Sequence, residues 1–129
     1  MGELIHKDLS EDIIGAAMKV LYVLRPGLEE RLYENALVIE LTARGHRVEQ
    51  QRKFLVQYEA QIIGTLQPDV IVDDLIIVDP KVVAAFTDTH VAQMTGYLAI
   101  TGLQLALLLN FKFSRLGMKR IVRTEVSGS

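Results

Sequence analysis

The chain has 129 residues, with 14 Lys and Arg against 16 Asp and Glu, and a formal net charge of −2 at pH 7. This length suits one domain with one sizeable core, and a content of 50% hydrophobic residues excludes global disorder. Without a basic excess, any contact with nucleic acid requires a local basic patch. The absence of Cys excludes disulfide scaffolds, thiolate metal sites and cysteine nucleophiles.

Apolar runs such as residues 105–109 are far shorter than the roughly 20 residues of a membrane-spanning helix. Residues 1–7 lack the apolar core of a signal peptide. We therefore expect a soluble cytoplasmic protein.

Three segments have helical patterns. Ser10-Glu11-Asp12 predicts a helix start, with a capping hydroxyl followed by two acids in the first turn. Apolar residues then recur at helical spacing as far as Leu24, where Arg25-Pro26-Gly27 ends the helix. We expect a second helix over about 28–44, closed by Gly45 in the left-handed conformation, and a third over about 87–100, closed by Thr101-Gly102.

Between the second and third helices the pattern changes to β-branched and aromatic residues, and it ends in a hairpin of 68–72 and 76–78 around Asp73-Asp74. Two more strands, 103–111 and 119–124, follow the third helix. The predicted order, ααββββαββ, indicates an α+β or mixed α/β fold. We expect one domain over 1–129, ordered from about 9 to 122, with short flexible tails.

The richest chemistry lies at the two ends of this hairpin, in Pro68-Asp69 and Asp79-Pro80-Lys81. Because a strand alternates its faces, Asp79 and Lys81 point the same way. A two-residue loop would place Asp79 on the face opposite to Asp69. A three-residue loop that includes Leu75, or one bulge, sets the two carboxylates directly opposite each other, and we expect this second arrangement.

Two facing carboxylates repel each other unless a cation lies between them. Oxygen ligands of this kind suit Mg²⁺ or Mn²⁺, and Lys81 is suited to orient water or to stabilise phosphate charge. The alternative is an exposed ion pair of little energetic weight. The apolar strands around Asp69 and Asp79 favour a site, because an uncompensated charge is costly there.

These residues resemble the PD-(D/E)XK nuclease signature. Residues 27–33, Gly-Leu-Glu-Glu-Arg-Leu-Tyr, resemble the motif of the bacterial GxxExxY family of small PD-(D/E)XK nuclease-like proteins. Residues 93–97, Gln-Met-Thr-Gly-Tyr, resemble the Gln-x-x-x-Tyr element of RecB-like nucleases. The likeness covers roughly residues 9–122, in the expected order.

The resemblance implies a restriction-endonuclease-like core, in which a mixed β-sheet is flanked by helices, and Mg²⁺-dependent hydrolysis of phosphodiester bonds in DNA or RNA. It implies four catalytic residues. Lys81 would be the catalytic lysine, and the metal ligands would be Asp69, Asp79 and Glu30. It also implies that Gln93 and Tyr97, which share one helical face, bind substrate.

The third motif departs from the usual Glu-x-Lys pattern. Asp79 is one methylene shorter than glutamate, and Pro80 removes a ladder donor and so belongs at a sheet edge or bulge. The alternative function is therefore a catalytically inactive member of the fold that acts as a self-associating or partner-binding module. Because residues 76–83 and 103–111 are so apolar, we expect an exposed patch on the monomer and hence a homo-oligomer.

The remaining polar residues have less specific interpretations. We expect His90 to be a helix-surface residue with satisfied hydrogen bonds and Tyr33 to be a partly buried packing residue whose hydroxyl orients a neighbour. Two groups of basic residues stand out, and the second suits either a phosphate-tracking rim or a charged edge strand. The first group is Arg44, Arg47, Arg52 and Lys53, and the second is Lys112, Arg115, Lys119, Arg120 and Arg123.

Overall fold

The computed structural model describes residues 4–123, so Thr124 and most of the predicted tails lie outside the described residues. The order of elements is ααβββββαββ, with one strand more in the central run than predicted. No helix in this part of the chain is long and apolar enough to cross a membrane. The elements are α1 (Lys7–Leu24), α2 (Glu30–Ala43), β1 (Val48–Gln50), β2 (Phe54–Tyr58), β3 (Gln61–Leu66), β4 (Val70–Val72), β5 (Ile76–Lys81), α3 (Asp88–Thr101), β6 (Leu105–Asn110) and β7 (Gly117–Val122).

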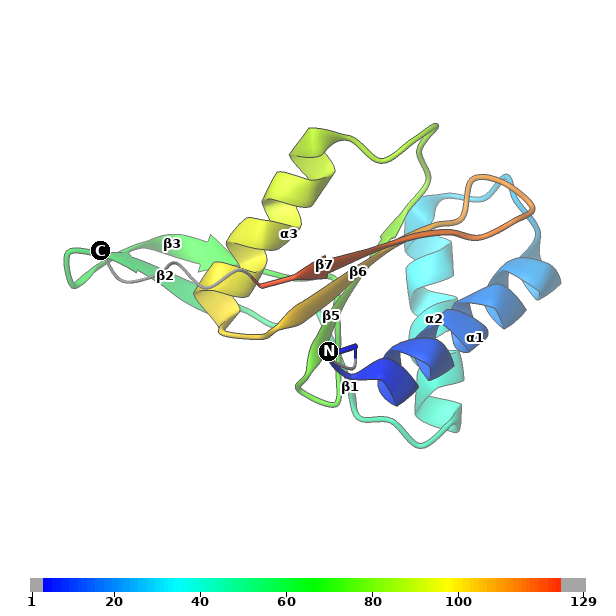
Figure 1. Cartoon of the computed structure of the whole chain (residues 1–129), viewed down its shortest axis with the longest axis horizontal. Helices are drawn as coiled ribbons and strands as arrows, with labels where there is room; N and C mark the ends of the chain where they lie inside the picture. The colour runs from blue at the N-terminus through cyan, green and yellow to red at the C-terminus, as the bar shows by residue number, and fades with distance from the viewer. Residues whose placement is uncertain (1–3, 124–129) are drawn as a thin grey trace.

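Five strands form one mixed sheet in the order β1-β4-β5-β6-β7. β5 and β6 are parallel and are joined through α3, whereas the other neighbouring strands are antiparallel. β2 and β3 form a separate two-stranded sheet that projects from the body (Figure 1). We call this hairpin, residues 54–66, the arm. The predicted mixed sheet flanked by helices is confirmed.

Helices cover both faces of the sheet, with α1 and α2 on one face and α3 on the other (Figure 1). Alternate strand residues divide between two buried clusters, as the pleat requires. Val70, Val78 and Leu107 pack on the side of α1 and α2, whereas Ile71, Ile77 and Leu108 pack on the side of α3.

The expected apolar patch on the two central strands was a wrong prediction. Residues 76–80 and 105–110 are buried within the monomer, because helices cover the sheet on both sides. The exposed apolar side chains lie elsewhere, most densely on the arm, where they are Leu55, Tyr58, Ile62 and Ile63.

Ser10 is not the cap of α1, which begins one turn earlier, at Lys7. The extra turn brings Leu9 against the core, and Ser10 is buried inside the helix. Its hydroxyl donates to Lys7 O at 2.9 Å and accepts from Arg120 Nη1 at 3.1 Å. The hydroxyl therefore joins α1 to β7 instead of closing the helix end.

The end of α2 agrees with the prediction, because Gly45 has a φ of 92°. Gly45 N donates to Thr42 O at 3.0 Å and His46 N donates to Leu41 O at 3.1 Å. This pair of bonds is the Schellman motif, in which the glycine turns the chain back over the last helical carbonyls. The motif fixes where His46 leaves the helix.

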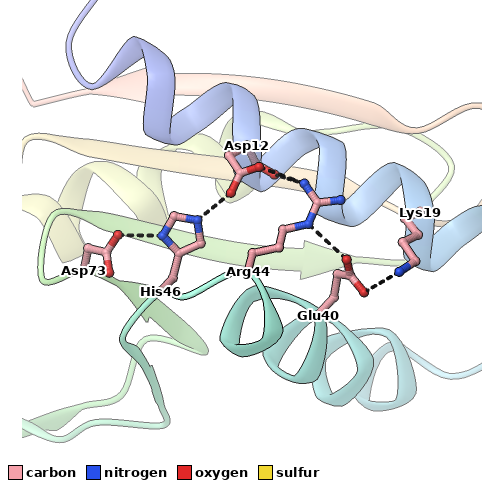
Figure 2. Close-up of polar contacts among 6 residues, drawn as sticks. All are labelled: Asp12, Lys19, Glu40, Arg44, His46 and Asp73. Atoms are coloured by element: carbon pink, nitrogen blue, oxygen red, sulfur yellow. Dashed lines mark hydrogen bonds and ion pairs between the residues drawn. The ribbon is translucent and has the colours of Figure 1, made fainter.

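A chain of polar contacts starts from His46 and joins α1, α2 and the β4–β5 turn (Figure 2). His46 Nδ1 lies 2.8 Å from Asp73 Oδ2, and His46 Nε2 lies 2.5 Å from Asp12 Oδ2. Arg44 then bonds Asp12 at 2.8 Å and Glu40 at 3.0 Å. Hydrogen bonds from His46 and Arg44 hold the pKa of Asp12 below its usual value, and those to Asp12 and Asp73 raise the pKa of His46.

Candidate active site

The β4–β5 hairpin has the register that was predicted from its turn. Val70 pairs with Val78, and Val72 pairs with Ile76, which leaves Asp73, Asp74 and Leu75 between the strands. One further step along this register sets Asp69 opposite Asp79. The turn is possible because Asp73 and Asp74 adopt φ values of 53° and 56°, which aspartate tolerates better than most residues.

Asp79 is a buried carboxylate that is incompletely compensated. The residue is 4% exposed, and its Oδ1 atom has no hydrogen-bond partner among the described residues. Lys81 Nζ lies 3.5 Å from Asp79 Oδ2, so the two side chains share a face of β5 as predicted. Burial and the neighbouring Asp69 raise the pKa of Asp79 to about 7, with Glu30 adding to the effect and Lys81 opposing it.

Burial first, and the nearby Asp69 second, raise the pKa of Asp79, so its ionised form has a shortage of compensating positive charge. A proton shared with Asp69 relieves this shortage, and a bound cation relieves it as well. Hard divalent cations prefer carboxylate oxygens, so the donor set fits such an ion. Glu30 is half-buried at the start of α2. Within residues 4–123, however, no three His, Asp or Glu side chains are gathered closely enough to hold a metal ion.

Pro80 lies in a central strand, but at a point where the strand has only one neighbour. The β4 pairing stops at Val78, whereas β6 continues alongside β5 to Lys81. Lys81 O accepts from Phe111 N at 2.8 Å on the β6 side, so the preceding residue turns its nitrogen to the other side. The missing N–H therefore costs no ladder bond, and Pro80 leaves Lys81 on the site face.

Gln93 and Tyr97 contact each other on α3, where Gln93 Nε2 lies 3.2 Å from Tyr97 Oη. Met94 and Leu98 face the sheet, whereas Gln93 is exposed and Tyr97 is half-buried. The hydrogen bonds of the described residues include none from this pair to Asp69 or Asp79. His90, which was expected on the helix surface, is partly exposed, and its Nδ1 accepts from Thr87 N at 3.1 Å in the cap of α3.

Tyr33 shapes the loop that leads into Glu30. Its ring is fully buried and stacks on Phe111, with the ring centroids 4.9 Å apart. Its hydroxyl donates to Arg25 O at 2.5 Å and accepts from Leu28 N at 3.1 Å. Tyr33 is thus a packing residue whose hydroxyl orients a neighbouring segment, as predicted, but it is fully buried and not partly buried as expected.

Sequence reasoning missed Gln51, which contacts Asp69, and Glu34, which contacts Gln51. Glu34 on α2 is 2% exposed, and Gln51 Nε2 lies 3.2 Å from both Glu34 Oε2 and Asp69 Oδ1. A signal for Glu34 existed, because it precedes the core residues Leu37 and Leu41 by three and seven positions and so falls on the buried face of α2. Nothing local in the sequence marks Gln51.

Asn110, a third missed residue, fixes the segment that follows Lys81. It is buried, and its Nδ2 donates to Val83 O at 2.8 Å while its Oδ1 accepts from Val83 N at 3.2 Å. The ladder between β5 and β6 ends at Lys81 and Asn110, and these side-chain bonds hold the chain after β5 against the end of β6.

Several basic residues have structural partners. In the first group, the side chains of Arg44, Arg47 and Arg52 pair with acids. In the second group, Arg120 bonds Ser10 and the carbonyl of Ile5, and Arg123 bonds Gly102 O at 3.3 Å. The exposed cations that remain for a phosphate-tracking rim are Lys112, Arg115 and Lys119.

Comparisons with known proteins are consistent with this geometry. Residues 7–121 match the model of a family described as the PD-(D/E)XK nuclease superfamily. Among curated proteins, no match to the sequence is found. The crystal structure of LHK-Exo in complex with dAMP is similar to this chain, with a TM-score of 0.50 and 15% identity, over 84% of this chain and 76% of the other.

A second structure, of an alkaline exonuclease (LHK-Exo) from Laribacter hongkongensis, has a TM-score of 0.49 at 15% identity over the same shares of both chains. At this identity the likeness to LHK-Exo is one of fold.

Proposed function

Because this chain belongs to the PD-(D/E)XK nuclease superfamily, we propose that it is a metal-dependent nuclease that hydrolyses phosphodiester bonds in DNA or RNA. Members of this superfamily generally use divalent metals. The observation that carries the proposal is the register of the β4–β5 hairpin, which sets Asp69 opposite a buried Asp79 that has an unpartnered oxygen.

In this proposal Asp69, Asp79 and Glu30 hold Mg²⁺ or Mn²⁺. The ion, when bound, supplies positive charge against the phosphate and the carboxylates. Lys81 donates hydrogen bonds from its ammonium group to the phosphate or to the attacking water, which favours the charge that develops in the transition state. Gln93 and Tyr97 bind the substrate backbone from α3.

The motif in residues 27–33 supports assignment to the GxxExxY group within this superfamily. Its glycine permits the turn after α1, with a φ of 113°, and its tyrosine anchors that turn through Arg25 O and Leu28 N. The motif would thus deliver Glu30 to the site. The proposal includes a cytoplasmic location, where nucleic acids are available as substrates.

Calorimetry with Mg²⁺ and Mn²⁺, on the parent and on Asp69→Ala, tests the carboxylate site. We expect binding to the parent and its loss in the variant, followed by metal-dependent cleavage of single-stranded or double-stranded DNA or RNA by the parent only. A well-folded parent that neither binds metal nor cleaves any of these substrates contradicts the proposal.

A second candidate function, an inactive self-associating module, is supported by the exposed apolar side chains of the arm. Ile62 and Ile63 are 60% and 66% exposed, and Ile62 pairs with Gln57 across the hairpin. Light scattering of the parent and of the double variant Ile62→Thr, Ile63→Thr tests this function. A parent oligomer that the variant dissociates supports it, and a monomeric parent contradicts it.

A further inference from the structure

We propose that Gln51 is a positioning residue, which holds the Asp69 carboxylate in the orientation that a metal ligand needs and is itself anchored by buried Glu34. This inference rests on the proposed function, because it concerns the same metal site.

The backbone of Gln51 bonds the backbone of Asp69, independently of either side chain. Gln51 N donates to Asp69 O at 3.0 Å, and Gln51 O accepts from Gln67 Nε2 at 3.0 Å. Gln51 also has a φ of 59°, a left-handed conformation that is uncommon for this residue type. Such strained positions persist where the surrounding contacts impose them, and they occur frequently near functional sites.

The side-chain amide of Gln51 connects two carboxylates. Its Nε2 atom lies 3.2 Å from Asp69 Oδ1 and 3.2 Å from Glu34 Oε2. An amide nitrogen carries two protons, so it can donate one to each acid. This contact uses one oxygen of Asp69 and leaves the other for a cation.

Glu34 is suited to anchor this amide because it is itself held firmly. Its side chain is 3% exposed, and it accepts from Gln50 Nε2 at 2.7 Å and lies 3.7 Å from Arg31 Nε. A buried carboxylate requires such donors. The bond from Gln51 therefore satisfies Glu34 on one side and orients Asp69 on the other, which links α2 to the hairpin through one side chain.

The neighbouring Gln50 provides a matched control. Its Nε2 atom bonds the same Glu34 oxygen at 2.7 Å and Asn35 Oδ1 at 2.7 Å, but it does not bond Asp69. A role limited to satisfying Glu34 would make the two glutamines equivalent. A role in positioning Asp69 makes only Gln51 important for the metal.

The test is Mn²⁺ binding by calorimetry, with unfolding in urea, on the parent, Gln51→Gly and Gln50→Ala. Glycine adopts a positive φ without steric cost and keeps the backbone bond to Asp69 O, so Gln51→Gly is expected to fold. We expect its Mn²⁺ dissociation constant to rise about 10-fold or more, the size of effect typical for residues that orient metal ligands. Its kcat on DNA falls while KM is unchanged. Gln50→Ala binds Mn²⁺ as the parent does.

Two results overturn the inference alone: Gln51→Gly binds Mn²⁺ as tightly as the parent, or Gln50→Ala weakens binding equally. A parent that binds no Mn²⁺ overturns the proposed function, and with it this inference, so the two failures are distinguishable.

Discussion

Lys81 Nζ lies 3.5 Å from Asp79 Oδ2, on the same face of β5, yet the lysine does not compensate the buried carboxylate. The pKa of Asp79 is raised to about 7 because burial and Asp69 outweigh the ammonium group. The apoprotein thus keeps a partly uncompensated charge in its sheet, as expected at a site that is completed by a ligand.

Replacement of Asp79 by Asn is expected to stabilise the metal-free protein while abolishing metal binding and cleavage. At pH 8 the parent carboxyl is ionised and buried, so its removal raises the free energy of unfolding by about 1 kcal/mol. At pH 5 the carboxyl of the folded parent is protonated but that of the unfolded chain is not, so the difference is smaller, and it disappears only below the ordinary pKa of 3.8. Urea unfolding at both pH values measures it.

Asp8→Asn, at an exposed position, is the control for the Asp79 prediction and changes stability by less than about 0.5 kcal/mol. A decrease in stability of Asp79→Asn at pH 8 would show that the carboxylate is adequately paired.

Replacement of Lys81 by Met is expected to separate metal binding from catalysis. Methionine keeps the length of the side chain but removes the ammonium group, which repels a cation at Asp79. The Mn²⁺ affinity is therefore equal to or greater than that of the parent, while kcat falls about 100-fold or more. Calorimetry and single-turnover cleavage measure the two effects, and an unchanged kcat would exclude a catalytic role for Lys81.

Replacement of His46 by Gln is expected to destabilise the protein more at pH 6 than at pH 9. The hydrogen bond to Asp12, aided by Asp73, raises the pKa of His46 above its ordinary value of 6.5. Its charged form therefore contributes stability fully below pH 6.5, and this contribution is lost as pH rises through the raised pKa. We expect a cost of about 1–2 kcal/mol at pH 6. Equal costs at both pH values would contradict a charged His46.

Replacement of Tyr33 by Phe keeps the stack on Phe111 but removes the hydroxyl partner of Arg25 O and Leu28 N. The free energy of unfolding is expected to fall by about 1–3 kcal/mol, because a partly buried polar group loses its bond. Tyr58→Phe, at an exposed position on the arm, is the control and has little effect. Chemical denaturation measures both variants, and equal effects would contradict the role of the hydroxyl.

The hairpin that carries Asp69 and Asp79 was predictable because the residues that determine it are neighbours in the sequence. β-branched residues indicate both strands, and once the alternation of faces is known, the length of the turn alone decides whether the two carboxylates face each other. Gly45 and Gly102 likewise end their helices as expected, with φ values of 92° and 77°. Such features depend on neighbours in sequence.

Features that depend on distant partners were not predictable from one sequence. Ser10 has the residue type of a cap, but Arg120, 110 positions away, bonds its hydroxyl within the helix. Gln51 has no distinguishing local pattern, and its role depends on Glu34 and Asp69, which other elements supply. The coverage of the central strands was misjudged for the same reason, since α1 and α2, from the start of the chain, and α3 bury them from both sides.

The chain leaves the main sheet after Gln50 and returns at Val70, and these two residues are paired across β1 and β4. The arm is therefore inserted between two residues that pair with each other in the main sheet. Changes in its length or composition would leave the alignment of β4 with β5 intact, whereas a single insertion within β5 would displace Asp79. Length and sequence can therefore vary in the arm without moving the two carboxylates, whereas in β5 they cannot.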